Sequence, residues 1–325
     1  MDIIRIGLLG AGDVADLHAE AINRIPGAEI AGLWNRTPEK GELKAAKYGC
    51  TTYVSDNALL NDPSVDAVFI LTNMETHADY AIRAARAGKH ILVEKPAASN
   101  IGELQKMQQA VNEAGVKCMP VHNYIYEAGI QRAKNMIQSG KLGDITQFYM
   151  LYNIHHAHDI RARYPGVIRQ ILTHHCYTMI YLAGLPKTIS CIKHTFGSDF
   201  APQENVAMAN IHMRNGTLSH LSASFANDDH AGDPWTCMIK VIGTKGSTRY
   251  SYRDWVINGR NGAHSQTYHC YPESIKNTAA HFIDKVLRSG EEPLSTLEDA
   301  IHCQRITEAC ERSVAEGIHI AYNEA

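Results

Sequence analysis

The chain has 325 residues, which is long enough for two domains of ordinary size. Hydrophobic residues make up 45% of it and charged residues 20%, and the net charge is −3 with neutral histidines, so neither a nucleic acid nor an acidic membrane is an expected partner. It has no apolar run of the ~18 residues that cross a bilayer, no leader-like start and no Cys-x-x-Cys pair among its eight cysteines. We expect a cytoplasmic protein with reduced thiols and no resident metal.

Residues 1–123 alternate between short apolar runs and helical patterns. The apolar runs cover residues 3–9, 29–34, 67–71 and 91–93. Continuous runs of this length are typical of parallel strands that are buried on both faces. Their alternation with helices predicts right-handed crossovers and a doubly wound parallel sheet, so we expect an α/β protein that begins with a Rossmann domain.

A glycine turn, Gly10-Ala11-Gly12-Asp13-Val14-Ala15, follows the first run and opens a helical pattern. It is a Gly-x-Gly-x-x-Gly motif with alanine, an accepted variant, at the third position. The first glycine allows a tight turn, and the second lets the backbone approach a diphosphate at the start of the helix. We therefore expect Gly10, Gly12, Asp13 and Val14 to bind a nicotinamide dinucleotide.

Asn35 and Arg36 stand at the end of the second predicted strand, where the adenosine ribose is expected. An acidic residue at this point selects NAD, whereas a nearby arginine accommodates the 2′-phosphate of NADP. Asn35 does not repel a phosphate and can bond a hydroxyl, and Arg36 is either a cofactor ligand or a solvated surface charge. The cofactor is NAD or NADP on this reading.

Residues 124–325 have a different pattern and form the predicted second domain. The pair Asn215-Gly216 lies between two alternating stretches, a strong hairpin signal, and two more strands flank residues 243–246. A helix is predicted over residues 274–289, and Ser295-Thr296-Leu297-Glu298 reads as a capping box before a last helix. This domain is expected to hold an antiparallel or mixed sheet.

The sequence resembles the glucose–fructose oxidoreductase / inositol dehydrogenase (Gfo/Idh/MocA) family along most of its length. Four motifs carry the resemblance: the glycine turn, Thr72-Asn73-Met74-Glu75-Thr76-His77, Ala87-Gly88-Lys89-His90-Ile91-Leu92-Val93-Glu94-Lys95-Pro96, and Ser139-Gly140-Lys141-Leu142-Gly143-Asp144-Ile145. The family has a C-terminal domain on a large open sheet that binds substrate on one side and often mediates oligomerisation on the other. The resemblance therefore implies a homo-oligomer, a dimer or tetramer.

The resemblance also implies roles for single residues. Further cofactor contacts are implied for Thr72, Asn73, His77, Glu94, Lys95 and Asn123. Lys95 would sit beside the nicotinamide and the reacting hydroxyl, where a cation stabilises a developing alkoxide and can pass on a proton.

The family's second signature is a glycine-led helix with Asp and, four residues later, His. The matching segment here begins at Gly166, with Gln170 in place of the Asp and His174 in place of the His. Gln cannot act as a base, so His174 is the second candidate acid/base; a buried structural histidine is the alternative. The turn after Asn123 also differs from the family's pattern, since relatives often carry Arg-Phe-x-Pro where this chain has residues 125–128.

A histidine-rich segment, residues 155–164, follows an alternating stretch that ends at Ile154. In a continuing strand His156 and His158 would share a face. They could contact sugar hydroxyls, bind a metal together with Asp159 or His174, or be plain surface residues. The nearby arginines 161, 163 and 169 would hold an anionic group or form a solvated face.

The leading functional hypothesis is an NAD(P)-dependent oxidoreductase that moves a hydride between nicotinamide and a secondary ring hydroxyl, such as C3 of a neutral pyranoside. Its candidate substrate-binding residues are Gln170, His156, His158, Arg163, Tyr124, Tyr126 and Tyr177. Hydroxyls and imidazoles donate and accept hydrogen bonds, and aromatic rings stack on sugars. The alternatives are a redox-cycling glycosidase, a non-catalytic dinucleotide sensor, and an enzyme for a nucleotide sugar or sugar phosphate.

Overall fold

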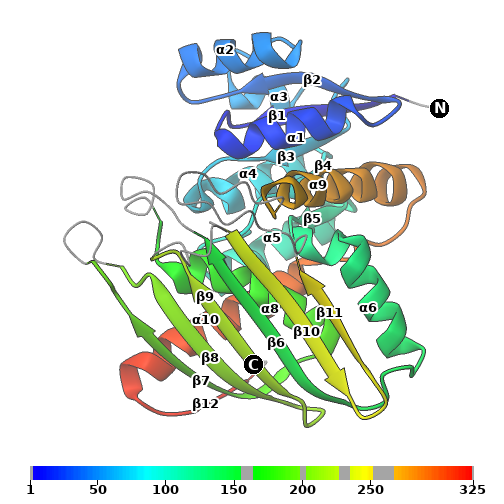
Figure 1. Cartoon of the computed structure of the whole chain (residues 1–325). Coiled ribbons are helices and arrows are strands. Elements are labelled where there is room, and N and C mark those ends of the chain that lie inside the picture. Colours follow the sequence, from blue (N-terminus) through cyan, green and yellow to red (C-terminus); the bar gives the residue numbers. More distant parts are fainter. Residues whose placement is uncertain (1–2, 155–163, 198–202, 227–234, 252–266, 324–325) are drawn as a thin grey trace, which may run out of the picture. The chain divides into compact units, whose positions relative to one another are not determined.

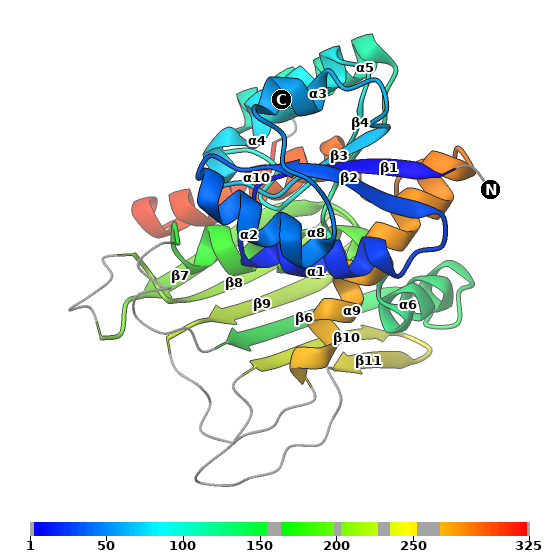
Figure 2. The same cartoon turned by 90° about the horizontal axis from the view of Figure 1, so that it is seen from above.

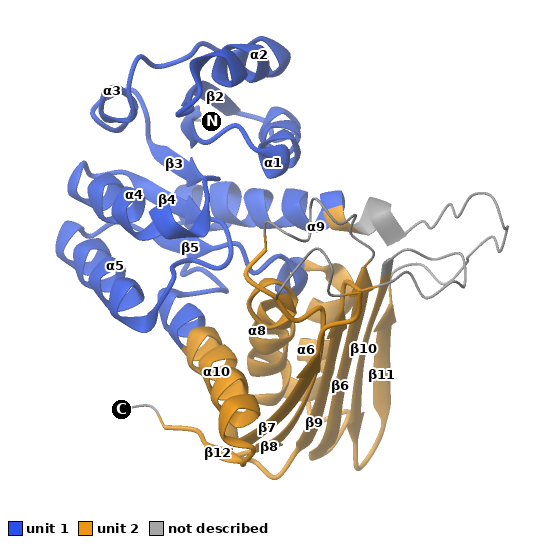
Figure 3. Ribbon diagram, turned by 90° about the vertical axis from the view of Figure 1, so that its left-hand side faces the viewer, with its two compact units in different colours: residues 1–126, 272–301 blue, residues 127–271, 302–325 orange. Residues whose placement is uncertain are grey.

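The computed structural model describes residues 3–154, 164–197, 203–226, 235–251 and 267–323. It divides into two compact units, residues 1–126 with 272–301 and residues 127–271 with 302–325 (Figure 3). The sequence analysis set a single boundary between residues 123 and 124. In the structure the first unit continues to residue 126, and residues 272–301 return to it.

The first unit contains a five-stranded parallel sheet, which confirms the predicted Rossmann domain (Figure 1). In spatial order its strands are β2 (Ala28–Trp34), β1 (Ile4–Leu9), β3 (Ala67–Ile70), β4 (His90–Val93) and β5 (Cys118–Pro120). Every residue of β3 is buried. Apolar side chains on both faces of such a strand explain why its sequence is a continuous apolar run.

Helices connect these strands. They are α1 (Asp13–Asn23), α2 (Pro38–Tyr48), α3 (Asp56–Leu60), α4 (Met74–Arg86) and α5 (Ile101–Ala114), followed by the short η1 (Asn123–Tyr126). Alanines on α4, among them Ala81, Ala84 and Ala85, are buried in the core that this helix shares with the sheet and with α5. Small side chains allow helices to pack closely here.

Two later helices differ in detail from their predictions. The helix predicted over residues 274–289 begins earlier, as α9 (Thr267–Ala280), and continues as the π-helix η3 (His281–Arg288). The last long helix is α10 (Leu297–Glu316). Its cap is Thr296, whose Oγ1 accepts from the Asp299 N–H at 3.1 Å, while Asp299 Oδ2 accepts from the Thr296 N–H at 2.8 Å. The capping box therefore lies one residue later than predicted.

The second unit contains the predicted mixed sheet, with seven strands (Figure 2). In spatial order they are β11 (Ser247–Ser251), β10 (Trp235–Gly243), β6 (Ile145–Ile154), β9 (Leu218–Ser224), β8 (Val206–Met213), β7 (Pro186–His194) and β12 (Ile320–Ala321). Only the β6–β9 pair is parallel among the strand pairs of this sheet that the structure describes. The hairpins predicted at residues 215–216 and 243–246 are confirmed.

Three helical segments lie wholly in this unit and pack with its sheet or with one another: α6 (Ala128–Gln138), η2 (Ile168–Leu172) and α8 (Thr173–Ala183). Most of α10, residues 302–316, belongs to it as well. Burial alternates along β8, where Ala207 and Ala209 are buried but Met208 and Asn210 are exposed. One face of the sheet is therefore packed and the other open. Within the described ranges, no helix is long and apolar enough to cross a membrane.

Candidate functional site

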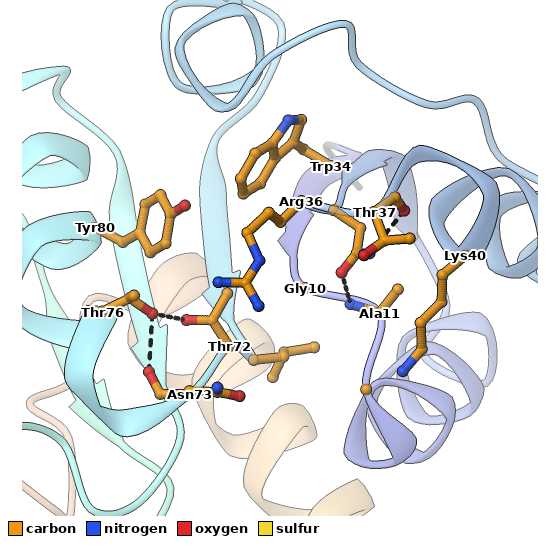
Figure 4. A pocket seen from close by; sticks show the side chains of 13 residues that line it. Gly10, Ala11, Trp34, Arg36, Thr37, Lys40, Thr72, Asn73, Thr76 and Tyr80 are labelled. Carbon is orange, nitrogen blue, oxygen red and sulfur yellow. Dashed lines mark hydrogen bonds between the residues drawn. The ribbon is translucent and has the colours of Figure 1, made fainter.

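A cavity of about 220 Å³ lies at the carboxyl edge of the parallel sheet (Figure 4). It is bounded by residues at the ends of β1, β2 and β3 and by those that follow them. The strand order β2-β1-β3 means that the connections run to one side of β1 and then to the other, so the topological switch point lies between β1 and β3. Ligands of open α/β sheets bind at such a point. The lining residues are Gly10, Ala11, Gly12, Trp34, Asn35, Arg36, Thr37, Lys40, Leu71, Thr72, Asn73, Thr76 and Tyr80.

The turn after β1 requires glycine at its first position. Gly10 has a φ of 106°, and a Cβ there would lie 2.7 Å from the carbonyl oxygen of Leu71. Gly12 is the N-cap of α1, so the N–H groups of Asp13 and Val14 have no partner within the helix, whereas the Ala15 N–H donates to the Gly12 carbonyl at 3.1 Å. This helix end attracts anions and fits the diphosphate of a dinucleotide.

Asn35 fastens the end of β2 to the glycine turn. The Ala11 N–H donates to Asn35 Oδ1 at 3.0 Å, and Asn35 Nδ2 donates to the Thr37 carbonyl at 2.9 Å. The Arg36 side chain also lines the cavity (Figure 4). The end of β2 therefore presents a neutral amide and a cation.

The residues after β3 form the opposite wall of the cavity. Thr76 Oγ1 is 2.8 Å from Thr72 Oγ1 and 2.8 Å from the Asn73 carbonyl oxygen. His77 is buried, with its ring nitrogens 2.9 Å from the Thr72 carbonyl and 2.8 Å from the Pro96 carbonyl, and burial lowers its pKa. Thr72 and Asn73 line the cavity, whereas the geometry of His77 supports a role in holding the two loops together.

Lys95 follows β4 and is half-buried beside a buried carboxylate. Glu94 Oε1 lies 2.9 Å from His18 Nε2, and Glu94 Oε2 accepts from the Lys95 N–H at 3.0 Å. Burial raises the pKa of Glu94, but the hydrogen bond from His18 and the charges of His18 and Lys95 outweigh it, so the net shift is downward. Burial lowers the pKa of Lys95 to about 8, against the opposing charge of Glu94.

Three residues of η1 that were expected near the cofactor or substrate are buried in the first unit. Asn123 Nδ2 donates to Ser274 Oγ at 2.6 Å, and the Tyr126 hydroxyl lies 2.8 Å from Ser295 Oγ. Tyr124 is fully buried. These contacts support a structural role for Tyr126, so Tyr126 is not among the substrate contacts that we propose.

In the second unit, the helix that carries Gln170 and His174 begins at a glycine that cannot be replaced without displacing a neighbour. Gly166 has a φ of 105°, and a Cβ there would lie 2.3 Å from Glu204 Oε1. The turn that follows, η2, is a π-helix, whereas the sequence suggested a plain α-helix. Its wider turn alters the relation of Gln170 to His174, and single π turns are frequent at functional sites.

His174 and His175 face different neighbours, as their adjacent positions on α8 require. His174 is buried, its Nδ1 lies 2.7 Å from the Tyr177 hydroxyl, and its ring meets Tyr152 edge to face. His175 instead has Nε2 2.9 Å from the Ser222 carbonyl of β9, and burial lowers its pKa to about 4. The structure brings His174 and Tyr177 together, and it uses His175 to fasten α8 to the sheet.

Arg169, which the sequence analysis left as either an anion ligand or a solvated charge, forms an ion pair within the second unit. Its Nε and Nη2 donate to the two carboxylate oxygens of Glu311 at 2.7 and 2.9 Å. His156, His158 and Arg163, with the rest of residues 155–163, lie outside the described residues. Among the residues that are described, no cluster of His, Cys, Asp or Glu could hold a metal ion.

Sequence reasoning missed several residues of these sites. Thr37, Lys40 and Tyr80 line the cavity, His18 contacts Glu94, and Glu204 contacts the helix at Gly166. The first turn of the helix after β2 must lie at the carboxyl edge of the sheet, so the sequence did hold a signal for Thr37 and Lys40. The contact of Glu204 joins segments far apart in the chain and had no local signal.

Two family models match the chain. A model of an oxidoreductase family with an NAD-binding Rossmann fold matches residues 4–122, and a model of the GFO/IDH/MocA C-terminal domain matches residues 130–249. Together they cover most of both units.

Three curated relatives are similar over nearly the whole chain. The 4-carboxy-2-hydroxymuconate-6-semialdehyde dehydrogenase of a Sphingobium strain is 27% identical, over 93% of this chain and 96% of that protein. The 1,5-anhydro-D-fructose reductase of Ensifer adhaerens is 26% identical, over 91% and 92%. The inositol 2-dehydrogenase of Rhizobium meliloti is 26% identical, over 96% and 97%.

Proposed function

Because this chain belongs to the Gfo/Idh/MocA family of oxidoreductases and has its NAD-binding Rossmann domain, we propose that it is an NAD(P)-dependent dehydrogenase of a sugar or glycoside. The reacting group is a secondary ring hydroxyl, for which we propose C3 of a neutral pyranoside. The observation that carries the proposal is Lys95, a half-buried amine at the end of β4 whose pKa is lowered to about 8.

The cavity of the first unit fits a dinucleotide. Gly10 leaves no room for a side chain against Leu71, and the uncapped N–H groups at the start of α1 suit a diphosphate. Thr72 and Asn73 supply polar groups on the opposite wall. When bound, the nicotinamide ring accepts or returns the hydride.

Lys95 would handle the proton of the substrate hydroxyl. As a neutral amine it takes that proton during oxidation, and as an ammonium ion it returns the proton during reduction. A pKa near 8 allows both forms near neutral pH. Glu94, fixed by His18, keeps a negative charge beside it and so limits how far burial lowers the pKa of Lys95.

The helix of the second unit would bind the substrate. Gln170, His174 and Tyr177 are its proposed contacts, and the 2.7 Å contact between His174 Nδ1 and the Tyr177 hydroxyl orients the imidazole. An amide at position 170 can bond a hydroxyl but cannot take its proton. We therefore propose His174 as a second acid/base, and His156, His158 and Arg163 as further contacts on sequence grounds alone.

A sugar-like substrate is supported by the names of two relatives, a reductase of an anhydrofructose and an inositol dehydrogenase. A third relative is named for a carboxy-hydroxymuconate semialdehyde, so family membership alone does not fix the substrate. Arg169 is paired with Glu311, so we do not propose it as a contact for the charged group of a sugar phosphate or nucleotide sugar. A neutral glycoside is our proposal among these substrates.

The test is a substrate screen with Lys95→Ala as the decisive variant. Free sugars, alkyl and aryl glycosides, sugar phosphates and nucleotide sugars are incubated with NAD or NADP while nicotinamide absorbance is followed. We expect wild-type turnover on neutral glycosides and a loss of ~10²-fold or more in Lys95→Ala, with dinucleotide binding retained. Lys106→Ala, on the exposed face of α5, is the matched control.

Other outcomes would change the assignment. Activity confined to charged sugars would refute the neutral-glycoside proposal. Release of an aglycone without net cofactor reduction would identify a redox-cycling glycosidase, and tight dinucleotide binding without any turnover would identify a sensor. Full turnover in Lys95→Ala would remove Lys95 from the mechanism.

A further inference from the structure

Two buried cysteines meet in the second unit, Cys191 on β7 and Cys310 on α10. Cys191 is 4% exposed and Cys310 is fully buried. The Cys310 thiol donates a hydrogen bond to the Cys191 sulfur. One turn further along α10, Ser313 Oγ accepts from the Cys191 N–H at 3.0 Å. The strand and the helix are therefore fastened together at the point where the two sulfurs meet.

Cys191 lies on an edge of the sheet, although its sulfur is buried. β12 pairs with β7 only at Thr188 and Ile189, so beyond them the outer side of β7 has no neighbouring strand within the described residues. The Cys191 N–H bonds the Ser313 side chain instead of a strand. A segment with so few backbone partners opens locally at a low free energy, so a small neutral solute can reach this sulfur.

The hydrogen bond makes the two thiols chemically unequal. It lowers the pKa of the Cys191 thiol, against the opposing effect of burial. The same bond raises the pKa of the Cys310 thiol well above its ordinary value, and burial adds to this effect. Burial also raises the pKa of the Cys118 and Cys176 thiols. The thiolate is the nucleophilic form of cysteine, so Cys191 is the attacking sulfur of the pair.

We infer that Cys191 and Cys310 form a peroxide-reactive pair, in which oxidation closes a reversible disulfide between β7 and α10. The Cys191 thiolate attacks one oxygen of hydrogen peroxide, the O–O bond breaks, and Cys191 becomes a sulfenic acid. The hydroxide that leaves takes up the proton that Cys191 had released.

The second step joins the two sulfurs. The Cys310 sulfur attacks the Cys191 sulfur, the S–O bond breaks, and the Cys310 proton leaves with the oxygen as water. In total the two thiols lose two electrons and two protons, and one molecule of peroxide becomes two molecules of water.

The disulfide would act on the proposed substrate helix through α10. Glu311, the residue after Cys310, holds Arg169 through hydrogen bonds of 2.7 and 2.9 Å. Arg169 precedes Gln170 on η2. A covalent bond at Cys310 displaces this part of α10, and a small misplacement of a positioned group costs a large factor in rate. This consequence rests on the proposed function, whereas the disulfide itself does not.

The test is mass spectrometry of the whole chain after it is reduced, freed of reductant and treated with hydrogen peroxide. The remaining thiols are blocked with N-ethylmaleimide, and the chain is digested without reduction. We expect a linked peptide pair that joins Cys191 to Cys310, the loss of two of the eight thiols, and full reversal by dithiothreitol.

Three variants assign a role to each sulfur. Cys310→Ser removes the second sulfur, so Cys191 should stop at the sulfenic acid, which dimedone traps as a stable adduct. Cys191→Ser should give neither the adduct nor the linked pair. Cys303→Ser, at another buried position of α10, is the matched control and should form the linked pair as the wild type does.

Turnover gives the second measurement. Oxidation should lower the wild-type kcat by ~10-fold, and dithiothreitol should restore it. Dinucleotide binding should not change, because the cavity that fits the dinucleotide belongs to the first unit.

Two results would overturn the inference. If peroxide leaves both thiols reduced, or links Cys176 or another cysteine in their place, the pair is an ordinary part of the core. A linked pair that forms without any change in kcat would show that α10 does not transmit the disulfide to the substrate helix. The mass measurement needs neither cofactor nor substrate, so it remains decisive even if the proposed function fails.

Discussion

Lys95 is the residue whose protonation we expect to set the pH dependence of turnover. Its pKa is lowered to about 8 by burial, from an ordinary value of ~10.4. Oxidation needs the neutral amine, so its rate should fall as pH falls through about 8. Reduction needs the ammonium ion, so its rate should fall as pH rises through the same region. Rate profiles measured in both directions check this, and two profiles that bend the same way would contradict it.

Glu94 gives a second prediction at this scale, because its charge raises the pKa of Lys95 against burial. Glu94→Gln keeps the shape and can keep both hydrogen bonds, since the His18 ring can accept from an amide in its other tautomer. We expect the midpoint of the oxidation profile to move to lower pH, with dinucleotide affinity little changed. An unmoved midpoint would show that Lys95 does not titrate in the rate.

Glu204 contacts the start of a helical element, and its removal gives a prediction about that element. Its Oε1 accepts from the Ile168 N–H at 3.3 Å, its carbonyl accepts from the Val167 N–H at 3.0 Å, and its Oε2 is 3.1 Å from Lys193 Nζ. It therefore fixes the start of the helix that carries Gln170 and His174. We expect Glu204→Ala to lower the free energy of unfolding by about 1 kcal/mol or somewhat more, as for a lost helix cap.

The same variant should lower kcat and leave dinucleotide binding unchanged, because the cavity that fits the dinucleotide belongs to the first unit. Glu316→Ala removes an exposed carboxylate that pairs with Arg312 four residues before it, and should cost only a few tenths of a kcal/mol. Denaturant unfolding and steady-state kinetics on both variants make the comparison. Equal effects in the two would show that Glu204 is an ordinary surface charge.

Elements with a local signal were predictable from the sequence. The strands of the first unit could be predicted because each is an apolar run. The turn at Gly10 could be predicted from its glycine motif, and the hairpin at residues 215–216 from its Asn-Gly pair. The π turn at residues 168–172 was not predictable, because its residues fit an α-helix equally well. Capping at Thr296 was missed by one residue, because Ser295 is an equally good cap by type and is used elsewhere.

Contacts between segments far apart in the chain could not be predicted from the sequence. Arg169 pairs with Glu311 across 142 positions, and the Tyr126 hydroxyl meets Ser295 across 169. Nothing local distinguishes such residues from a free arginine or a pocket tyrosine. The site residues that could be named in advance are those whose motif also fixes their place in the fold, such as Gly10, whereas Tyr126 and Arg169 were reinterpreted once their partners were known.

At the scale of the whole molecule, the expected homo-oligomer can be tied to a particular surface, the open face of the second unit's sheet. The strand registers place one residue from each of five neighbouring strands in a row on this face: Ile192, Met208, Ser222, Leu151 and Met238. Ile192 is 68% exposed and Met208 40% exposed. Four of the five side chains are apolar, and a sheet face of this kind is a usual site of association.

We therefore expect the protein to form a dimer or tetramer in which this row meets its counterpart in a second copy. A two-fold interface brings the same patch together from both subunits, so a charge placed at its centre faces an identical charge across the axis. Met208→Asp combined with Ile192→Asp should then yield monomers in size-exclusion chromatography with light scattering, at unchanged circular dichroism. Leu43→Asp, at a 70% exposed apolar residue of α2 in the first unit, is the matched control and should remain oligomeric. A wild-type protein that is monomeric at micromolar concentration, or a double variant that stays assembled, would place this row outside any subunit interface.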